Sequence, residues 1–463
     1  MTTPPAPAEP TEGQRQRVLW LSTVAFTLMF AVWLMFGMLA VKFEPELGLS
    51  DGQLYNLTLV AILAGSLPRF HFGIWTDKYG GRVVMPLLLL LVVVPAALVS
   101  QATTYTHLMV LAGLFGLAGN SFSVGIAWCA AWFPKERQGL ALGIFGAGNV
   151  GASATKLFGP FLIALVPATG FFDGAIPGGW RFIPVVYSAL LVLTAAAVYL
   201  LAPKIDRTPA KGKTFAEIVK PVGNAKVWEY CLQYVVVFGA YVALSNLLPN
   251  YYMTNYGSEL AAQLDLSPTL SADYKAIAAL KGDAFTGYMT ANPAVKTDYE
   301  YLFRWVGFLA AVCYVFPASL LRPLGGYLSD TIGPRKVMTA VFAAMLVAGS
   351  VLTFVPGLGV WAFTAALFAL GVGMGVGKAG TYKLIPEAFP KDVGAVGGLV
   401  GALGALGGVL VPLCAAPLQA ATGKPQMLFG VLLALNVVST GWFAVSGLAA
   451  RAKSPAVAEA VPA

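Results

Sequence analysis

The segment SLPRFHFGIWTDKYGGR at residues 66–82 returns in the second half of the chain as SLLRPLGGYLSDTIGPR at residues 319–335. Both copies place an arginine, a glycine, an aspartate, a second glycine and a last arginine in the same register: Arg69, Gly73, Asp77, Gly80 and Arg82 in the first copy, and Arg322, Gly326, Asp330, Gly333 and Arg335 in the second. FPKE at residues 133–136 returns in the same order as FPKD at residues 389–392. Matches at so many positions in one register indicate an internal duplication.

The composition excludes a water-soluble protein. Of the 463 residues, 58% are hydrophobic and 11% are charged, whereas a soluble domain carries roughly 45–50% apolar and about 25% charged residues. Apolar runs of about 20 residues recur along the chain, which is the length of a helix that spans a bilayer. Because these runs are continuous rather than alternating, they also exclude an outer-membrane β-barrel. The sequence therefore predicts an all-α membrane protein.

Twelve spans can be drawn, six before and six after a basic linker. They run over residues 18–41, 55–76, 83–103, 107–133, 139–167, 181–202, 228–253, 303–328, 336–355, 359–388, 394–420 and 426–449. Each is expected to be helical because backbone groups in hydrocarbon must be satisfied within their own segment. The predicted order is a disordered tail (1–17), a first six-helix bundle (18–202), a linker (203–227), a second six-helix bundle (228–450) that includes a polar loop (254–302), and a second tail (451–463).

The basic residues set the predicted orientation. The net charge is +8 at pH 7, and Lys and Arg are concentrated in the segments on the side of both termini. Membrane proteins keep such residues in their cytoplasmic loops, so we expect both termini and the linker in the cytoplasm of a bacterium, and residues 254–302 outside its inner membrane. The same distribution explains the charge without a nucleic acid partner. The four cysteines show no metal-ligand spacing, so the sequence predicts no metal and no other cofactor.

The pattern Gly-x-x-x-Asp-x-x-Gly-x-Arg between the second and third spans of each half resembles the signature of the major facilitator superfamily. The resemblance covers the whole chain and implies two six-helix bundles that rock about a site at the bilayer midplane, hence a transporter and not an enzyme. The motif predicts a conformational latch. Asp77 and Asp330 would meet a neighbouring helix N-terminus or Arg82 and Arg335, while Gly73 and Gly326 let helices pack closely. Ordinary loop charges are the alternative.

Five cations lie within the drawn spans, with no Asp or Glu at comparable depth: Arg69, Lys156, Arg322, Lys378 and Lys383. Each uncompensated charge costs roughly 2.5–3.5 kcal/mol near a helix centre, and an anionic substrate would offset that cost. Arg69 and Arg322 hold equivalent positions and are expected to face each other across the central pathway. Guanidinium is a planar fork that matches a planar oxyanion. The alternative is that each arginine is a structural strut bonded to backbone carbonyls.

The fifth and eleventh spans carry glycine-rich stretches, GIFGAGNVG at residues 143–151 and GALGALGG at residues 401–408. Together with the paired arginines and GLAGNSF at residues 116–122, they resemble the nitrate/nitrite porter family. The resemblance implies that Arg69 and Arg322 clamp the anion. It further implies that Asn149 and Tyr234 form hydrogen bonds to the anion and that the rings of Phe122 and Phe238 cover its flat faces. Gly148 and Gly401 would expose backbone beside the anion. Packing alone is the alternative for the glycines and for the aromatic pair.

Three lysines bear on how transport is driven. An inside-negative membrane opposes anion entry by about 2.3 kcal/mol per charge per 100 mV, so uptake must be coupled. Lysine can lose its proton when desolvated, and Lys156, Lys378 and Lys383 are therefore candidates for coupling to protons, with snorkelling as the alternative for Lys383. They favour nitrate/proton symport over exchange with nitrite, which stays open. A monomer is expected, and a carrier of another small anion or a non-transporting anion sensor are the rival functions.

Overall fold

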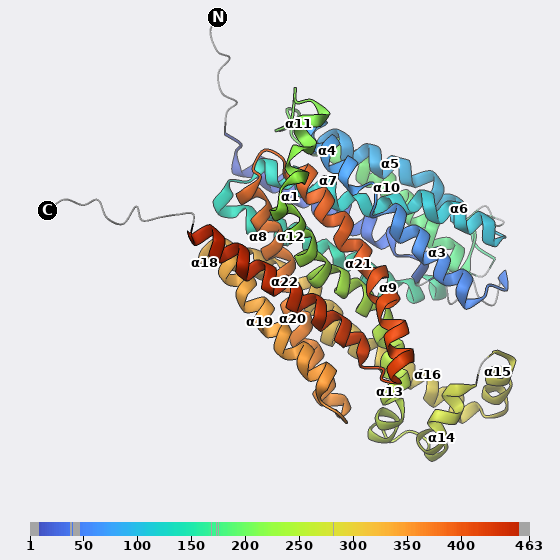
Figure 1. Ribbon diagram of the computed structural model, residues 1–463. Helices are drawn as coiled ribbons and strands as arrows, with labels where there is room; N and C mark the ends of the chain where they lie inside the picture. Colours follow the sequence, from blue (N-terminus) through green and yellow to red (C-terminus); the bar gives the residue numbers. More distant parts are fainter. Residues whose placement is uncertain are drawn as a thin grey trace, which may run out of the picture.

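The computed structural model describes residues 9–37, 39, 47–167, 169–172, 174, 176–280 and 282–452 of the chain. Helices make up nearly all of this part (Figure 1). The helices of the first half are α1 (Glu12–Trp33), α3 (Asp51–Ala64), α4 (Arg69–Tyr79), α5 (Gly81–Val99), α6 (Tyr105–Phe115), η1 (Gly116–Asn120), α7 (Ser121–Trp132), η2 (Lys135–Arg137), α8 (Gln138–Ala147), η3 (Gly148–Val150), α9 (Gly151–Leu165), η4 (Gly179–Arg181) and α10 (Phe182–Leu201).

The linker contains two short helices, and the second half then follows. Its elements are α11 (Phe215–Val219), η5 (Lys220–Gly223), α12 (Ala225–Tyr234), η6 (Val235–Gly239), α13 (Ala240–Gln263), α14 (Pro268–Ala279), α15 (Gly282–Ala291), α16 (Pro293–Ala310), η7 (Ala311–Val315), α17 (Phe316–Leu320), α18 (Arg322–Ile332), α19 (Pro334–Phe354), α20 (Val360–Ala388), α21 (Val393–Thr422) and α22 (Met427–Ala452). Of these, η6 and η7 are π-helical turns within longer helices.

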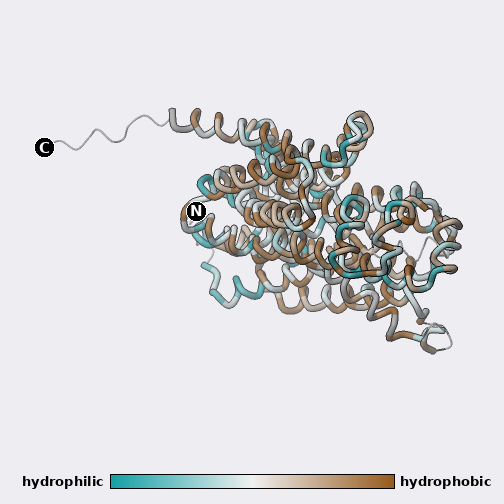
Figure 2. Tube along the Cα trace, turned by 90° about the horizontal axis from the view of Figure 1, so that it is seen from below, coloured by the Kyte–Doolittle hydropathy of each residue, from teal (hydrophilic) through white to brown (hydrophobic). Residues whose placement is uncertain are grey.

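The predicted fold class, an all-α membrane protein, is confirmed. Eleven helical segments in the described part are long and apolar enough to cross a membrane. The remaining predicted span, 139–167, corresponds to α8, η3 and α9, which follow one another directly along the chain. Large apolar side chains also cover the outer surface, as at Leu87 and Val94 of α5, each 62% exposed. Figure 2 shows hydrophobic residues along the long helices and hydrophilic ones gathered in the connections. Such an outer surface suits lipid rather than water.

The segment 254–302, expected to be a polar loop, is largely helical in its described part. Helix α13 continues to Gln263, and α14, α15 and the start of α16 follow it. Tyr274 of α14 is buried and donates to the Met253 carbonyl over 2.8 Å, which fixes α14 against α13. These helices lie at the end of the molecule opposite the linker helix α11 (Figure 1). The sequence analysis identifies helices by long apolar runs, and the polar residues of this segment interrupt any such run.

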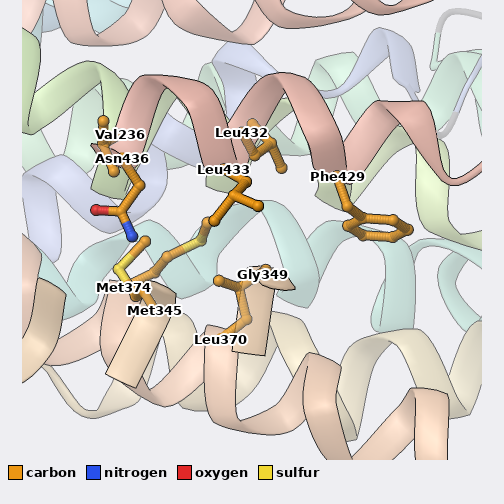
Figure 3. A pocket seen from close by; sticks show the side chains of 9 residues that line it. All are labelled: Val236, Met345, Gly349, Leu370, Met374, Phe429, Leu432, Leu433 and Asn436. Atoms are coloured by element: carbon orange, nitrogen blue, oxygen red, sulfur yellow. The ribbon is translucent and has the colours of Figure 1, made fainter. Parts of the chain in front are cut away.

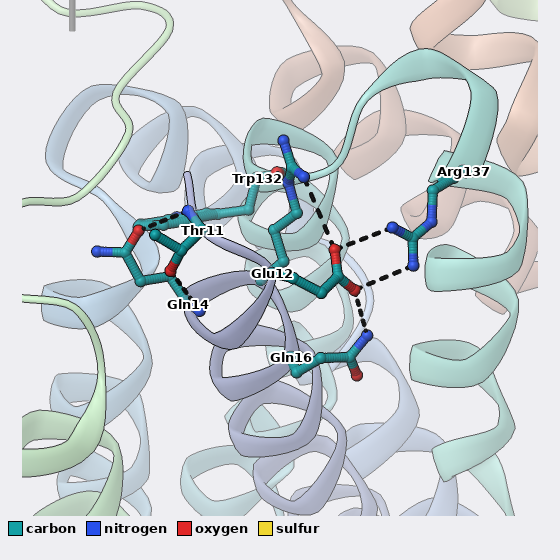
Figure 4. Close-up of polar contacts among 7 residues, drawn as sticks. Thr11, Glu12, Gln14, Gln16, Trp132 and Arg137 are labelled. Atoms are coloured by element: carbon teal, nitrogen blue, oxygen red, sulfur yellow. Dashed lines mark hydrogen bonds and ion pairs between the residues drawn. The ribbon is translucent and has the colours of Figure 1, made fainter. Parts of the chain in front are cut away.

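The first helix is anchored at its start by polar contacts (Figure 4). Thr11 and Gln14 form a capping box, in which each side chain satisfies the other residue's backbone N–H. Glu12 accepts from both terminal nitrogens of Arg137, at 2.9 and 3.0 Å, and ties α1 to η2. Paired bonds of this kind fix orientation as well as distance. They hold the beginning of α1 against the connection between α7 and α8.

Candidate functional site

Arg69 and Arg322 are the first residues of α4 and α18. In both halves the preceding helix ends shortly before the arginine: α3 has its C-cap at Gly65, and α17 has its C-cap at Leu321. The side chains of both arginines are 0% exposed. Two guanidinium groups are therefore enclosed inside the helical part of the protein, where each charge is costly.

Each arginine donates to a backbone carbonyl in the other half of the chain. Arg69 donates from Nη1 to the carbonyl of Gly401 in α21, at 2.9 Å, and from Nε to its own half at Gly65, at 2.8 Å. Arg322 donates from Nη1 to the carbonyl of Gly146 in α8, at 3.0 Å, and from Nη2 to the Tyr234 hydroxyl, at 3.3 Å. The two glycine-rich helices thus present bare carbonyls to the arginines. The hydrogen bonds to backbone carbonyls that a structural role predicts are therefore present, but they do not use every N–H donor of the two guanidinium groups.

Two donors of the arginine pair have no protein partner. These are Nη2 of Arg69 and Nε of Arg322, both buried. None of the ion pairs in the part of the chain that the structure describes involves either arginine. Buried charges are normally paired, because an unpaired one loses its hydration without compensation. The pair therefore retains positive charge and hydrogen-bonding capacity for an anion.

Aromatic rings enclose the arginine pair. The guanidinium carbons of Arg69 and Arg322 each lie 5.4 Å from the centroid of Phe122 in α7. The Phe238 ring of η6 lies 6.2 Å from Phe122 and nearly parallel to it, with 6° between the planes. Tyr234 is 6.1 Å from Phe122 at 14°. One ring therefore touches both cations, and two further rings face it almost in parallel.

Asn149 is a buried amide whose hydrogen bonds are unmade. It lies in η3, directly after α8, and is 0% exposed. Neither its Oδ1 nor its Nδ2 has a partner in the structure. Buried polar groups nearly always have one, so this amide is available to a ligand. Gly148 beside it packs closely against α1, since a side chain there would meet Phe26.

Two aromatic residues that the sequence analysis missed belong to the same cluster. Tyr382 of α20 crosses Tyr234 edge-on at 4.7 Å, and its hydroxyl donates to the Gly397 carbonyl at 2.9 Å. Trp33 of α1 lies 5.0 Å from the Arg69 guanidinium carbon. The position of Tyr382 four residues after Lys378 in one helix could have indicated it. Nothing in the sequence distinguishes Trp33 from other apolar residues of its span.

The structure places the three candidate lysines differently. Lys378 is 0% exposed, donates to the Ala318 carbonyl at 2.9 Å, and lies 3.2 Å from the Tyr241 ring centroid. Its Nζ is 5.6 Å from the centroid of the Phe238 ring, and the Arg69 guanidinium carbon is 5.9 Å from the same centroid, so Lys378 lies next to the aromatic cluster around the arginines. Lys383 lies elsewhere and is treated with the latch below. The side chain of Lys156 in α9 lies outside the described residues.

The two motif aspartates, Asp77 and Asp330, each bind the start of a helix in the other half. Asp77 accepts from the backbone N–H of Gly394, at 2.8 Å, at the start of α21. Asp330 accepts from the N–H groups of Gly139 and Leu140, at 2.9 and 2.7 Å, at the start of α8. A carboxylate at a helix N-terminus is favoured by the helix dipole. Both halves are thereby joined at the end of the bundles that carries the linker.

The glycines of the motif are required by close contacts and by backbone turns. A side chain on Gly73 would meet the backbone of Gly394, and one on Gly326 would meet the backbone of Gly139. Gly80 and Gly333 have φ of +87° and +90°, a conformation that side chains disfavour. The motif therefore combines close helix packing with a turn that positions the aspartate.

Among the described residues, the motif arginines, Arg82 and Arg335, form no ion pair with the motif aspartates. Arg82 donates to the carbonyls of Lys204 and Tyr199, at 3.2 and 3.1 Å. Arg335 donates to the carbonyl of Phe443, at 3.1 Å. Of the two partners predicted for the aspartates, the helix N-termini are the ones observed.

Lys383 strengthens the Asp330 contact. Its Nζ lies 2.7 Å from Asp330 Oδ1, and it also donates to the Lys135 carbonyl. At 3% exposure Lys383 does not snorkel. Lys383 therefore belongs to the latch and not to the arginine pair. Its ion pair with Asp330 also shows that one of the five cations has an acidic partner, contrary to expectation.

The linker crosses the same end and contacts both halves. Asp206 accepts from the indole N–H groups of Trp128 and Trp132, at 3.1 and 2.8 Å, and from the backbone N–H of Arg82, at 2.8 Å. Further along, Lys213 forms an ion pair with Asp392 at 2.7 Å. The linker is thus bound to α7 on one side and to the start of α21 on the other.

A separate small pocket lies within the second half, between α19, α20 and α22 (Figure 3). Its lining is apolar, with Asn436 as its polar side chain, and none of the arginine-pair residues reaches it. In the described part of the chain no group of three His, Cys, Asp or Glu side chains could hold a metal ion. The arginine pair is therefore the candidate site.

Comparison with known proteins agrees with this arrangement. The family model of the Major Facilitator Superfamily matches twice, over residues 21–280 and 276–462. The probable nitrate/nitrite antiporter NarK1 of Thermus thermophilus is 48% identical over 455 residues, which cover 95% of this chain and 93% of that protein. The probable nitrate/nitrite transporter NarK2 of Mycobacterium tuberculosis (strain ATCC 25618 / H37Rv) is 30% identical, covering 95% and 96%. The nitrite extrusion protein of Bacillus subtilis (strain 168) is 28% identical, covering 92% and 93%.

Solved structures show the same fold. The crystal structure of the transporter FucP in its outward conformation aligns with a TM-score of 0.64 at 15% identity, covering 92% of this chain and 98% of that one. The human organic anion transporter MFSD10 aligns with a TM-score of 0.62 at 13% identity, covering 95% and 100%. The double match to one family model also agrees with the internal duplication. The chain is therefore a multi-pass membrane protein of the Major Facilitator Superfamily and belongs, within it, to the nitrate/nitrite porter family.

Proposed function

We propose that this protein carries nitrate, and also nitrite, across the inner membrane of a bacterium by alternating access. The observation that carries the proposal is the buried pair Arg69 and Arg322, which has no acidic partner in the described part of the chain and retains unused donors. Nitrate is a planar anion that accepts in its plane, as the fork of a guanidinium donates. The names of the relatives at 48% and 30% identity point to the same substrates.

The geometry suggests how the anion would be held. Nη2 of Arg69 and Nε of Arg322 would donate to its oxygens, and the Asn149 amide would supply a further donor. Phe122 and Phe238 would cover its faces. A flat ion between two rings needs roughly 7 Å, twice the optimal carbon contact distance. The centroids of these nearly parallel rings are 6.2 Å apart, so the two halves would have to separate slightly to admit the ion.

Alternating access requires that the latch open and close. Asp77 and Asp330 each bridge the halves at the linker end, and the arginines bridge them at the site. An anion that takes over arginine donors would weaken the Arg69–Gly401 and Arg322–Gly146 contacts. Binding would thereby loosen the central contact between the halves, leaving the latch as the remaining barrier at that end. The linker end is the cytoplasmic end, since it carries the basic residues.

For the coupling we propose proton symport through Lys378. This lysine is fully buried, has one carbonyl partner and lies next to the aromatic ring of Phe238. A desolvated lysine can exchange its proton during the cycle. Exchange of nitrate for nitrite is the second candidate, because the relative at 48% identity is named an antiporter.

Reconstituted protein tests both parts of the proposal. Counterflow of labelled nitrate demonstrates a carrier, and an anion sensor would show none. Nitrate uptake into liposomes free of nitrite, with acidification of the lumen that is lost in Lys378→Met, supports symport. Uptake that strictly requires internal nitrite would establish exchange instead. Because one chain supplies both halves of the site, we propose that the monomer is the functional unit.

A further inference from the structure

A groove of about 660 Å³ opens on the outer surface of the second half, between α19 and α22. Its lining shares no residue with the arginine pair. Its α19 side runs from Arg335 and Lys336 past Ala343 to Leu346, and its α22 side includes Phe443 and Leu448. The groove is therefore basic at one end and apolar along its length.

Two cations mark the end of the groove at the start of α19. Arg335 and Lys336 are both exposed. Arg335 donates from Nη2 to the Phe443 carbonyl and lies 4.8 Å from the Phe443 ring, which aligns it along the groove and leaves its remaining N–H groups unused. Lys336 has no ion pair in the part of the chain that the structure describes. The carboxylate of Glu229 lies within electrostatic range of Arg335 and balances part of its charge, so Lys336 is the cation that remains fully available to an anion.

The length of the groove matches one leaflet of a bilayer. From Arg335 to Leu346 the α19 helix rises roughly 16 Å at 1.5 Å per residue, and half of the hydrocarbon core is about 15 Å thick. With the cations at headgroup level, the apolar part would lie beside the acyl chains of the same leaflet. A free inorganic anion has no apolar part that could contact this length of the groove.

The first half offers a direct comparison. Arg82 is the counterpart of Arg335, and its guanidinium is covered by the carbonyls of Lys204 and Tyr199. The acidic Asp206 of the linker lies against the Arg82 backbone. The counterpart of Lys336 is Val83, an apolar residue. The second cation and the open groove are therefore specific to the second half and are not part of the repeated motif.

We propose that this groove binds a phospholipid with an anionic headgroup, taken from the cytoplasmic leaflet. The phosphate would meet Arg335 and Lys336, and one acyl chain would lie between α19 and α22. The leaflet rests on the orientation given under the proposed function. Basic pockets between spanning helices on the cytoplasmic side are suited to such headgroups.

Native mass spectrometry of the purified full-length protein tests the site, with phosphatidylglycerol and phosphatidylcholine of identical chains as probes. The wild type should retain phosphatidylglycerol preferentially. Lys336→Gln should reduce its binding constant about five-fold, the effect of one cation near an anionic surface. Ala343→Phe keeps the charge but fills the groove, and should reduce the retention of both lipids. Lys220→Gln removes an exposed cation of the linker outside the groove and should behave as the wild type.

The outcomes separate this site from the proposed function. Equal retention of the two lipids, an equal loss in Lys220→Gln, or unchanged binding in Ala343→Phe would each overturn the lipid site, provided that the thermal unfolding of the variants matches the wild type. Nitrate counterflow is measured on the same preparations. Absent counterflow with an intact preference for phosphatidylglycerol would contradict the proposed transport and leave the lipid site standing.

Discussion

Arg69 donates to the backbone carbonyl of Gly401, a residue 332 positions away along the chain and in the opposite half of the molecule. Arg322 repeats the relationship with Gly146 in the reverse direction. The two halves are thus held together at the candidate site by the side chains that would bind the substrate. If the arginines bind the substrate as proposed, binding and movement of the halves would be coupled through the same hydrogen bonds.

Gly401→Ala should weaken nitrate binding about ten-fold without unfolding the protein. A Cβ at this position would come within 2.8 Å of the Tyr382 hydroxyl and 3.4 Å of the Phe122 ring, so the cluster around Arg69 must shift. Isothermal titration of purified protein with nitrate measures the effect. Gly397→Ala, one turn earlier, is the matched control, because its Cβ would have ordinary contacts of 3.4 and 3.5 Å. Equal affinities of the two variants would contradict the prediction.

Phe122→Leu should lower nitrate affinity by roughly two- to thirty-fold, since a cation–aromatic contact contributes about 0.5–2 kcal/mol and Phe122 touches both arginines. Leucine keeps the apolar bulk and removes the ring. The same titration provides the measurement. Phe363→Leu removes a buried ring from a separate aromatic cluster on α20 and should leave affinity unchanged. If both variants lose affinity equally, the ring of Phe122 has no special role.

Asp330→Asn and Lys383→Met should each destabilise the protein. The double variant should lose less stability than the sum of the losses in the two single variants. Their side chains are 8% and 4% exposed and form an ion pair. Removing one partner of a buried pair leaves an uncompensated charge, at a cost of about 3–5 kcal/mol. Thermal unfolding in a double-mutant cycle measures the coupling. Strict additivity would show that the pair does not interact.

Asp206→Asn should release the linker. The carboxylate accepts from two indoles and from the backbone of Arg82, and the neutral amide can replace these bonds only in part. Limited trypsin digestion should then cut after Arg207 or Lys211 several-fold faster than in the wild type. Thr208→Ala, two residues away, removes a side chain with no hydrogen bond among the described residues. Equal cleavage rates for the two variants would argue against a bound linker.

The sequence could predict the parts of the molecule that repeat or that break a general rule. Arg69 and Arg322 stand out because charges in apolar spans are costly and because both halves carry one at the same position. The motif aspartates stand out because the spacing is repeated. Each of these signals is local, or compares two segments that are aligned without a gap.

Contacts that depend on how distant segments meet could not be predicted. Asp330 and Lys383 lie on α18 and α20, and no spacing in the sequence links them, so the sequence alone places Lys383 among the candidate coupling lysines. Asp206 is one of several charges in a polar linker, and its role depends on the two indoles of α7. Tyr382 and Trp33 are aromatic residues in apolar spans, where such residues usually serve only the core.

Nitrate binding to Arg69→Lys and Arg322→Lys tests the central claim most directly. Lysine keeps the positive charge but lacks the planar fork. If a guanidinium pair recognises the anion, each variant should lose about ten- to a hundred-fold in nitrate affinity, as expected for a hydrogen bond to a charged group of about 1.5–3 kcal/mol, while its thermal unfolding persists as a cooperative transition. Wild-type affinity in both lysine variants would contradict the account.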